Sequence, residues 1–228
     1  LVYNPAVTDE AAPAGIIDGV NYNSDGTSVT LSLFAPHKNN VYVIGDFNDW
    51  QVDTDYFMNR HVVDSDSTRW WLNINGLESG KEYAYQYFVD GRLRIADPYS
   101  DKILDPWNDH HIAESVYSNL KAYPKDKTQY SVSVLQPGQT AYDWETTGFV
   151  APKKEELIIY ETLIRDFISS HDYKTLTDSL DYFERLGINA IELMPINEFE
   201  GNSSWGYNPS FLFAPDKYYG PKNDLKVF

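Results

Sequence analysis

The chain has 228 residues, a length that allows one large domain or two small ones. Its 34 acidic and 18 basic residues give a formal net charge of −16. A surface this acidic repels phosphate groups, which excludes nucleic acid and anionic membranes as partners. Hydrophobic residues make up 42% of the chain, enough for a packed core. There is no cysteine, which excludes disulfides, thiolate metal sites and thiol nucleophiles. The absence of any run of 18 apolar residues argues against membrane insertion.

Residues 1–14 are rich in alanine and proline, lack an apolar period and predict a linker. Within residues 15–117, apolar and polar side chains alternate from Val29 to about Val89, as in half-buried antiparallel strands. Several short strands separated by tight turns indicate a β-sandwich with an immunoglobulin-like fold. The apolar positions that define the strands are Val29, Leu31, Leu33, Val41, Val43, Tyr83, Tyr85, Tyr87 and Val89, and the turns are Asp25-Gly26, Asn75-Gly76 and Asp90-Gly91.

Residues 118–156 contain scattered prolines and predict an irregular connector. The pattern changes in residues 157–228. A short apolar run at 157–160 predicts a strand buried on both faces, and a helical pattern that begins near Thr175 as its N-terminal cap and stops at Gly187 follows it. A second buried strand at 190–194 completes a βαβ unit with parallel strands.

The common catalytic patterns GxGxxG, GxxxxGK[ST], HExxH and GxSxG are absent from the sequence. The five histidines are expected at surfaces or turns, and no acidic group has the spacing of a calcium loop, so no metal site is predicted. Asn202-Ser203-Ser204 matches a glycosylation sequon, a pattern that is frequent by chance.

Two segments of the predicted sandwich carry a recognisable pattern, 45–50 (GDFNDW) and 85–91 (YQYFVDG). They resemble the early-set sandwich of amylase-type enzymes, which is related to carbohydrate-binding module family 48. The resemblance implies that Trp50 stacks on glucose. Leu93 stands near the place of the family's second tryptophan, and Gln86 stands where a sugar-binding lysine is often found. The competing interpretation is that Trp50 packs inside the sandwich and the domain braces its neighbour.

A second pattern covers residues 157–228 without a gap, and it resembles the opening of the catalytic domain of glycoside hydrolase family 13, the α-amylase family. That resemblance implies the first βα units of a truncated (β/α)8 TIM barrel. The strings that carry it are 159–161 (IYE), 187–196 (GINAIELMPI), 204–209 (SWGYNP) and 213–220 (FAPDKYYG).

The loop after the second barrel strand is where such barrels build their sites. The resemblance implies that Tyr207 stacks on the sugar whose bond is cut. Trp205 and Asn208 either line the same cleft or pack the loop against the barrel rim. Glu161, at the end of the first strand, either touches substrate or satisfies neighbouring backbone donors.

Retaining glycoside cleavage needs two carboxyl groups about 5–5.5 Å apart, one as nucleophile and one as acid and base. In the family both come from later barrel strands, so no catalytic residue is predicted in this chain, which ends at Phe228 inside the expected second barrel helix. The chain alone, without the C-terminal barrel portion, is therefore expected to be inactive. No cofactor is implied for it, although calcium is allowed for in full-length family members.

The resemblance implies an enzyme that hydrolyses or transfers glucosyl units of starch, glycogen or maltodextrin, so the expected partner is an α-glucan polysaccharide or oligosaccharide. The alternative is a non-catalytic sandwich that binds α-glucan or has a purely structural role. Secretion or export to the periplasm is slightly favoured over the cytoplasm, and linkage preference stays open.

Overall fold

We describe the fold from a computed structural model covering residues 5–146 and 148–228. The chain divides into two compact units, each made of two stretches of sequence. Unit 1 is Leu1–Pro106 with Lys121–Thr140, and unit 2 is Trp107–Leu120 with Ala141–Phe228. This division departs from the predicted boundaries at residues 117 and 157, because the chain enters unit 2 briefly and then returns to unit 1.

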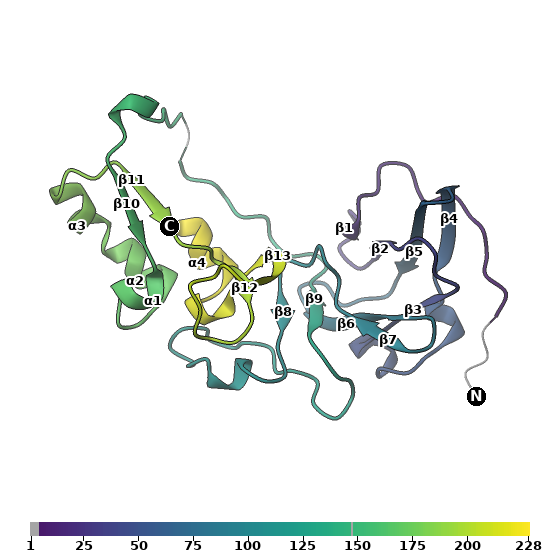
Figure 1. Cartoon of the computed structure of the whole chain (residues 1–228). Helices are drawn as coiled ribbons and strands as arrows, with labels where there is room; N and C mark the ends of the chain where they lie inside the picture. The colour runs from purple at the N-terminus through teal and green to yellow at the C-terminus, as the bar shows by residue number, and fades with distance from the viewer. Residues whose placement is uncertain (1–4, 147) are drawn as a thin grey trace. The chain divides into compact units, whose positions relative to one another are not determined.

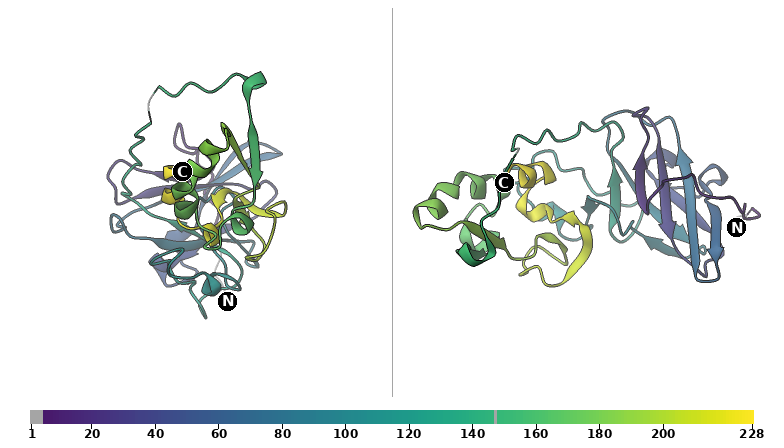
Figure 2. Two further views of the ribbon diagram at one scale, coloured as in Figure 1. Left: turned by 90° about the vertical axis from the view of Figure 1, so that its left-hand side faces the viewer. Right: turned by 90° about the horizontal axis from the view of Figure 1, so that it is seen from above.

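Unit 1 is a sandwich of two antiparallel sheets, shown in Figures 1 and 2. In the described residues the first sheet has the order β1-β2-β5-β4, and the second has the order β3-β6-β9-β8, with β7 paired to β6. The strands are β1 (Gly19–Tyr22), β2 (Val29–Phe34), β3 (Val41–Gly45), β4 (Asn59–Asp64), β5 (Ser67–Ile74), β6 (Tyr83–Val89), β7 (Leu93–Ile95), β8 (Ile103–Leu104) and β9 (Val132–Leu135).

The core of unit 1 lies between the two sheets and is built by alternate residues of the central strands. All nine apolar positions predicted from the period-two pattern belong to it, with Met58, Trp70, Ile74, Leu77 and Leu135. The three-residue connection between β6 and β7 has positive φ at both Asp90 and Gly91, the central residues of a tight turn closed by the Arg92 amide, which donates to the Val89 carbonyl. The alternation therefore locates the strands and the turn chemistry locates the hairpin.

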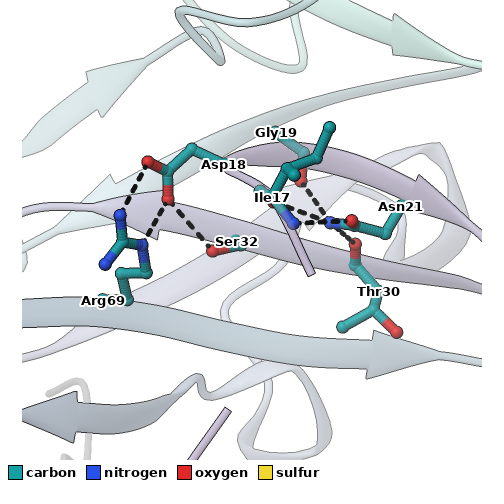
Figure 3. Close-up of polar contacts among 7 residues, drawn as sticks. All are labelled: Ile17, Asp18, Gly19, Asn21, Thr30, Ser32 and Arg69. Atoms are coloured by element: carbon teal, nitrogen blue, oxygen red, sulfur yellow. Dashed lines mark hydrogen bonds and ion pairs between the residues drawn. The ribbon is translucent and has the colours of Figure 1, made fainter. Parts of the chain in front are cut away.

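Strand β1 is an edge strand, and polar side chains fasten it to its neighbours (Figure 3). Asp18, just before β1, accepts two hydrogen bonds from Arg69 of β5, at 2.8 and 3.3 Å, and one from Ser32. Asn21 donates to the carbonyl oxygens of Ile17 and Thr30. Such contacts fix the register of an edge that pairs on one side only.

The predicted linker 1–14 is partly ordered against the sandwich. Residues 1–4 lie outside the described residues, but the backbone of Thr8 and Glu10 bonds with Arg60 of β4. Arg60 also forms an ion pair with Asp9 at 2.7 Å, and Trp71 donates its indole N–H to the Glu10 carbonyl. The alanine and proline content does not predict this pairing, because the pairing depends on β4, about 50 residues away in the sequence.

Unit 2 contains the predicted βαβ order. Its elements are β10 (Ile159–Thr162), α1 (Ile164–Phe167), α2 (Tyr173–Asp178), α3 (Leu180–Arg185), β11 (Ala190–Leu193), β12 (Asn197–Phe199), β13 (Pro209–Pro215) and α4 (Lys222–Val227). Strands β10 and β11 pair in parallel, and β12 pairs antiparallel with β13. Buried side chains of α2 and α3, Tyr173, Leu176 and Phe183, pack with partly buried residues of both parallel strands.

Four local expectations for unit 2 need correction. The first strand begins at Ile159 and not at residue 157, and it is not buried on both faces, since Ile159 is 53% exposed. The helix is interrupted at Ser179, and its N-terminal cap is Asp172, which accepts from the Thr175 amide at 2.6 Å. Asp172 lies three residues before Thr175 and satisfies the Thr175 amide itself, so the helix begins earlier than a Thr175 cap would place it.

Candidate glucan-binding loop

The most exposed aromatic side chains of β12, β13 and the segment between them lie on one loop, residues 200–208, which we call the aromatic loop. Trp205 is 63% exposed and Tyr207 is 65% exposed, and Asn208 is also exposed. All three predicted sugar contacts of unit 2 therefore stand on the loop between β12 and β13. Exposed aromatic rings present an apolar face that suits the C–H face of a sugar ring.

The backbone of the aromatic loop is fixed from within. The Ser204 hydroxyl donates to the Asn208 side-chain oxygen and accepts from the Gly206 amide at 2.9 Å. Gly206 has φ +86°, and a Cβ built on it would lie 2.1 Å from the Pro195 carbonyl oxygen. The loop therefore passes so close to Pro195 that only glycine fits at position 206. This close approach fixes the backbone between the two flanking aromatic residues, Trp205 and Tyr207.

Side chains from outside the loop hold it as well. Arg165, on α1, donates to the Ser203 hydroxyl at 3.3 Å and to the Ser204 carbonyl at 3.2 Å. On another side, the Asn202 amide donates to the Asn108 carbonyl at 3.0 Å. The sequon asparagine is thus engaged in a hydrogen bond within unit 2. Anchoring of this kind reduces the conformational entropy that a ligand must otherwise remove on binding.

A buried charge cluster lies at the base of the same hairpin. Lys217 is 3% exposed and binds Glu198 and Asp109, the latter at 3.3 Å. Asp216 accepts from the amides of Phe199 and Tyr218. Burial raises the pKa of Glu198 to about 8 and that of Asp216 to about 6. Burial alone would lower the pKa of Lys217, but the surrounding carboxylates outweigh it and raise that pKa.

The sequence does not predict this cluster, because a lysine between an aspartate and a tyrosine is normally expected at the surface. The only available signal was its place directly after an apolar strand, which is weak. Glu161, considered as a substrate contact, lies exposed on β10. Among the described residues no group of three His, Asp or Glu side chains is arranged to hold a metal ion.

The predicted sugar platform of the sandwich is buried. Trp50 is only 6% exposed, and its indole N–H donates to Asp46 at 3.0 Å. Gln86 is fully buried and donates to the carbonyls of Gln129 and Ser131, both at 2.8 Å. Stacking on glucose needs an open ring face, which Trp50 does not present in this structure. The packing interpretation of Trp50 is therefore the one that the geometry favours.

Residues 121–131 bind to the part of the sandwich that contains the GDFNDW segment and Gln86. Lys121 forms an ion pair with Asp46 at 2.9 Å, and Lys127 forms one with Asp49 at 2.7 Å. Thr128 donates to the Gln86 side-chain oxygen. This returning segment thus bonds to two residues of the GDFNDW segment, Asp46 and Asp49, and to Gln86, while Leu93 is exposed at 42%.

Replacing Trp50 by alanine should therefore destabilise the sandwich and leave glucan retention unchanged. Removal of a buried tryptophan typically costs about 3–5 kcal/mol of unfolding free energy. Denaturant unfolding and electrophoresis through amylose gels measure the two effects, with Trp144→Ala, at a 63% exposed tryptophan, as the control. Loss of retardation at an unchanged unfolding midpoint would instead restore Trp50 as a sugar contact.

Comparison with known proteins places these units in context. Residues 19–108 match the family carbohydrate-binding module 48 (isoamylase N-terminal domain). A malto-oligosyltrehalose trehalohydrolase of Saccharolobus solfataricus is 26% identical over 87% of this chain and 29% of its own length. A 1,4-α-glucan branching enzyme of Paramagnetospirillum magneticum is 30% identical over 95% of this chain and 27% of its own. The chain thus spans under a third of these relatives.

A solved structure of a GBS pullulanase in complex with maltotetraose shares the fold. It has a TM-score of 0.64 and 22% identity, covering 94% of this chain and 30% of its own. No helix in the described ranges combines the length and the apolar character needed to cross a bilayer. Residues 19–108 therefore match carbohydrate-binding module 48, and the chain is similar to the N-terminal part of relatives that belong to glycoside hydrolase family 13, the α-amylase family.

Proposed function

We propose that this chain belongs to an enzyme that cleaves or transfers α-glucosidic bonds of starch, glycogen or maltodextrin by a retaining route. The names of its relatives support this substrate class, since they include a trehalohydrolase and an α-glucan branching enzyme. The observation that carries the proposal for the chain itself is the exposed, internally bonded aromatic loop, with Trp205 and Tyr207 on it. A pullulanase structure of the same fold was solved with maltotetraose.

In this proposal unit 2 is the start of a (β/α)8 barrel, and its aromatic loop forms part of the substrate cleft. Tyr207 stacks on a glucosyl ring, and Trp205 and Asn208 contribute to the same contact. The catalytic carboxylates are supplied by later barrel strands, which leaves this chain a ligand-binding role. The parallel pair β10–β11 and the intervening helices α2 and α3 support the barrel assignment.

For the sandwich we propose a bracing role, with no glucan contact at Trp50. The burial of Trp50 and Gln86 and the ion pairs of residues 121–131 favour this over the alternative, a stand-alone glucan-binding module. The net charge of −16 supports a neutral polysaccharide over nucleic acid or an anionic membrane as the partner.

Tyr207→Ala should weaken binding of maltoheptaose to the 228-residue chain by about 30-fold, because loss of an aromatic contact of this kind costs about 2 kcal/mol. Isothermal titration calorimetry measures the change. Tyr207→Phe is the matched control, since it keeps the ring and removes only the hydroxyl. The side chain is 65% exposed, so neither variant should alter thermal unfolding. Equal affinity of Tyr207→Ala and the unaltered chain would refute the role of Tyr207.

A further inference from the structure

The aromatic loop is linked to a segment that precedes it by about 90 residues. This segment, Trp107–Leu120, belongs to unit 2 although residues on both sides of it belong to unit 1. We call it the strap. It contains a short 3₁₀ helix, Asp109–His111, and its backbone turns again at Val116, whose amide donates to Ala113. The strap lies outside residues 157–228, whose sequence pattern predicts the βαβ elements of unit 2.

The strap contacts the aromatic loop and its base at three places. At the loop, the Asn108 carbonyl accepts from the Asn202 side chain at 3.0 Å. At the base, Asp109 forms an ion pair with buried Lys217 at 3.3 Å. Beyond β13, the Val116 carbonyl lies 3.3 Å from the place that a Cβ on Gly220 would occupy. The strap therefore follows the hairpin from the loop to the residues that end it.

The buried charge cluster makes the ion pair between Asp109 and Lys217 costly to break. Lys217 is 3% exposed, and its ammonium group lies between Glu198, on β12, and Asp109, on the strap. One carboxylate oxygen of Glu198 is buried without a hydrogen-bond partner. A buried ammonium needs compensating charge, and separation of Lys217 from Asp109 would leave it with less. The base of the loop and the strap are therefore bound by an interaction that is costly to open.

Asp216, next to Lys217, ties the two sides of the hairpin base together. The Asp216 amide donates to the Ile196 carbonyl at 2.8 Å, and the Asp216 carboxylate accepts from the Phe199 amide at 3.2 Å. Asp216, directly after β13, is thereby bonded both to Ile196, just before β12, and to Phe199, the last residue of β12. The two strands are thus joined at the hairpin base, while the loop beyond it is anchored from outside by Arg165 and Asn108.

We propose that the strap is a positioning element for the aromatic loop: Asp109, through Lys217, and the Asn108 carbonyl, through Asn202, hold the loop in the conformation that presents Trp205 and Tyr207 to an α-glucan. This role rests on the proposed function for its ligand, but the restraint on the loop does not. Asp109 and Asn202 act through other residues and are positioning residues with no predicted sugar contact.

Hydrogen exchange of the 228-residue chain tests the restraint without any glucan. Asp109→Asn and Asn202→Ala should each speed amide exchange in residues 200–208 about tenfold, and leave β10 and β11 unchanged. Glu114→Gln is the matched control, because Glu114 lies in the strap and bonds only locally, to the Asn119 amide at 2.9 Å. Asp109→Glu should restore slow exchange. Exchange in 200–208 within twofold of the unaltered chain in both variants would overturn the proposal.

Binding of maltoheptaose separates this proposal from the proposed function. Asp109→Asn should weaken binding about tenfold, and Glu114→Gln should not. If Tyr207→Ala abolishes binding and Asp109→Asn leaves it unchanged, the proposed function stands and the positioning role is refuted. If the unaltered chain does not bind maltoheptaose, the proposed function fails for this chain, and the exchange measurement alone decides whether the strap restrains the loop. A variant that speeds exchange at β10 and β11 equally would mark Asp109 as merely structural and overturn the proposal.

Discussion

Asp97→Ala should remove about 3–6 kcal/mol from the unfolding free energy of unit 1. Asp97 is fully buried and accepts hydrogen bonds from the hydroxyls of Tyr85 and Tyr87, at 2.8 and 2.9 Å. It also accepts from the Tyr99 amide at 2.9 Å. Alanine would leave these donors buried without partners, and each orphaned group costs about 1–3 kcal/mol. A typical domain has only about 5–15 kcal/mol in total.

One effect opposes this loss. Burial raises the pKa of Asp97, so the folded protein holds its charged form at a cost that alanine would remove. The loss of three hydrogen bonds costs more than the removal of the buried charge gains, because the side chains of Tyr85 and Tyr87 are buried and their hydroxyls would be left without a partner. Burial also raises the pKa of both tyrosines, which keeps them protonated as donors.

The variant that separates these contributions is Asp97→Ala combined with Tyr85→Phe and Tyr87→Phe. Removal of donors and acceptor together is nearly neutral in many proteins, so the triple variant should recover most of the loss. Denaturant unfolding gives the free energies, and hydrogen exchange at β6 and β9 assigns them to unit 1. An Asp97→Ala chain within 1 kcal/mol of the unaltered one would contradict the interpretation.

Gly206→Ala should displace the aromatic loop and abolish the glucan binding proposed for it. An added Cβ would lie 2.1 Å from the Pro195 carbonyl oxygen, a distance that no packed structure tolerates, and the φ of +86° is unfavourable for alanine. Backbone strain of about 1–3 kcal/mol and a steric cost of similar size both apply, so unit 2 should lose about 2–5 kcal/mol or open the loop. Titration with maltoheptaose and thermal unfolding report the two outcomes.

Gly201 provides a matched control in the same loop. Its φ is +80°, but a Cβ there would meet nothing within 4 Å. Gly201→Ala therefore carries the conformational cost without the clash, and it should reduce stability modestly and keep most glucan binding. Equal effects of the two substitutions would mean that the close approach to Pro195 does not position the loop.

The sandwich was largely predictable from the sequence because its signals are local. The alternation at Val29, Leu31 and Leu33 places all three in the core, and the Asp90-Gly91 turn has the expected positive φ angles. Family resemblance added what periodicity could not, namely the likeness of the sandwich to carbohydrate-binding module 48, which residues 19–108 match. The barrel assignment rests on one parallel strand pair and so stays a proposal.

The features that escaped prediction depend on contacts distant in sequence. Nothing in the sequence near Asn108 indicates that its carbonyl meets Asn202, 94 residues later. Trp50 carries the motif of a sugar platform, but its burial depends on the packing of the whole sandwich. Lysine is normally a surface residue, but Lys217 is buried, because carboxylates from two other segments neutralise its charge. Local patterns cannot report such partners.

The alternation of the chain between its two units affects how it can fold during synthesis. Strand β9, Val132–Leu135, pairs with β6 and β8 in unit 1, although the strap is synthesised before it. The sandwich therefore cannot close its second sheet until about residue 135 has left the ribosome, and the strap must wait for β12 and β13 to appear before it has a partner. Neither unit is a module that a single cut could excise: a piece ending at residue 117 would lack β9, and one beginning at 141 would lack the strap.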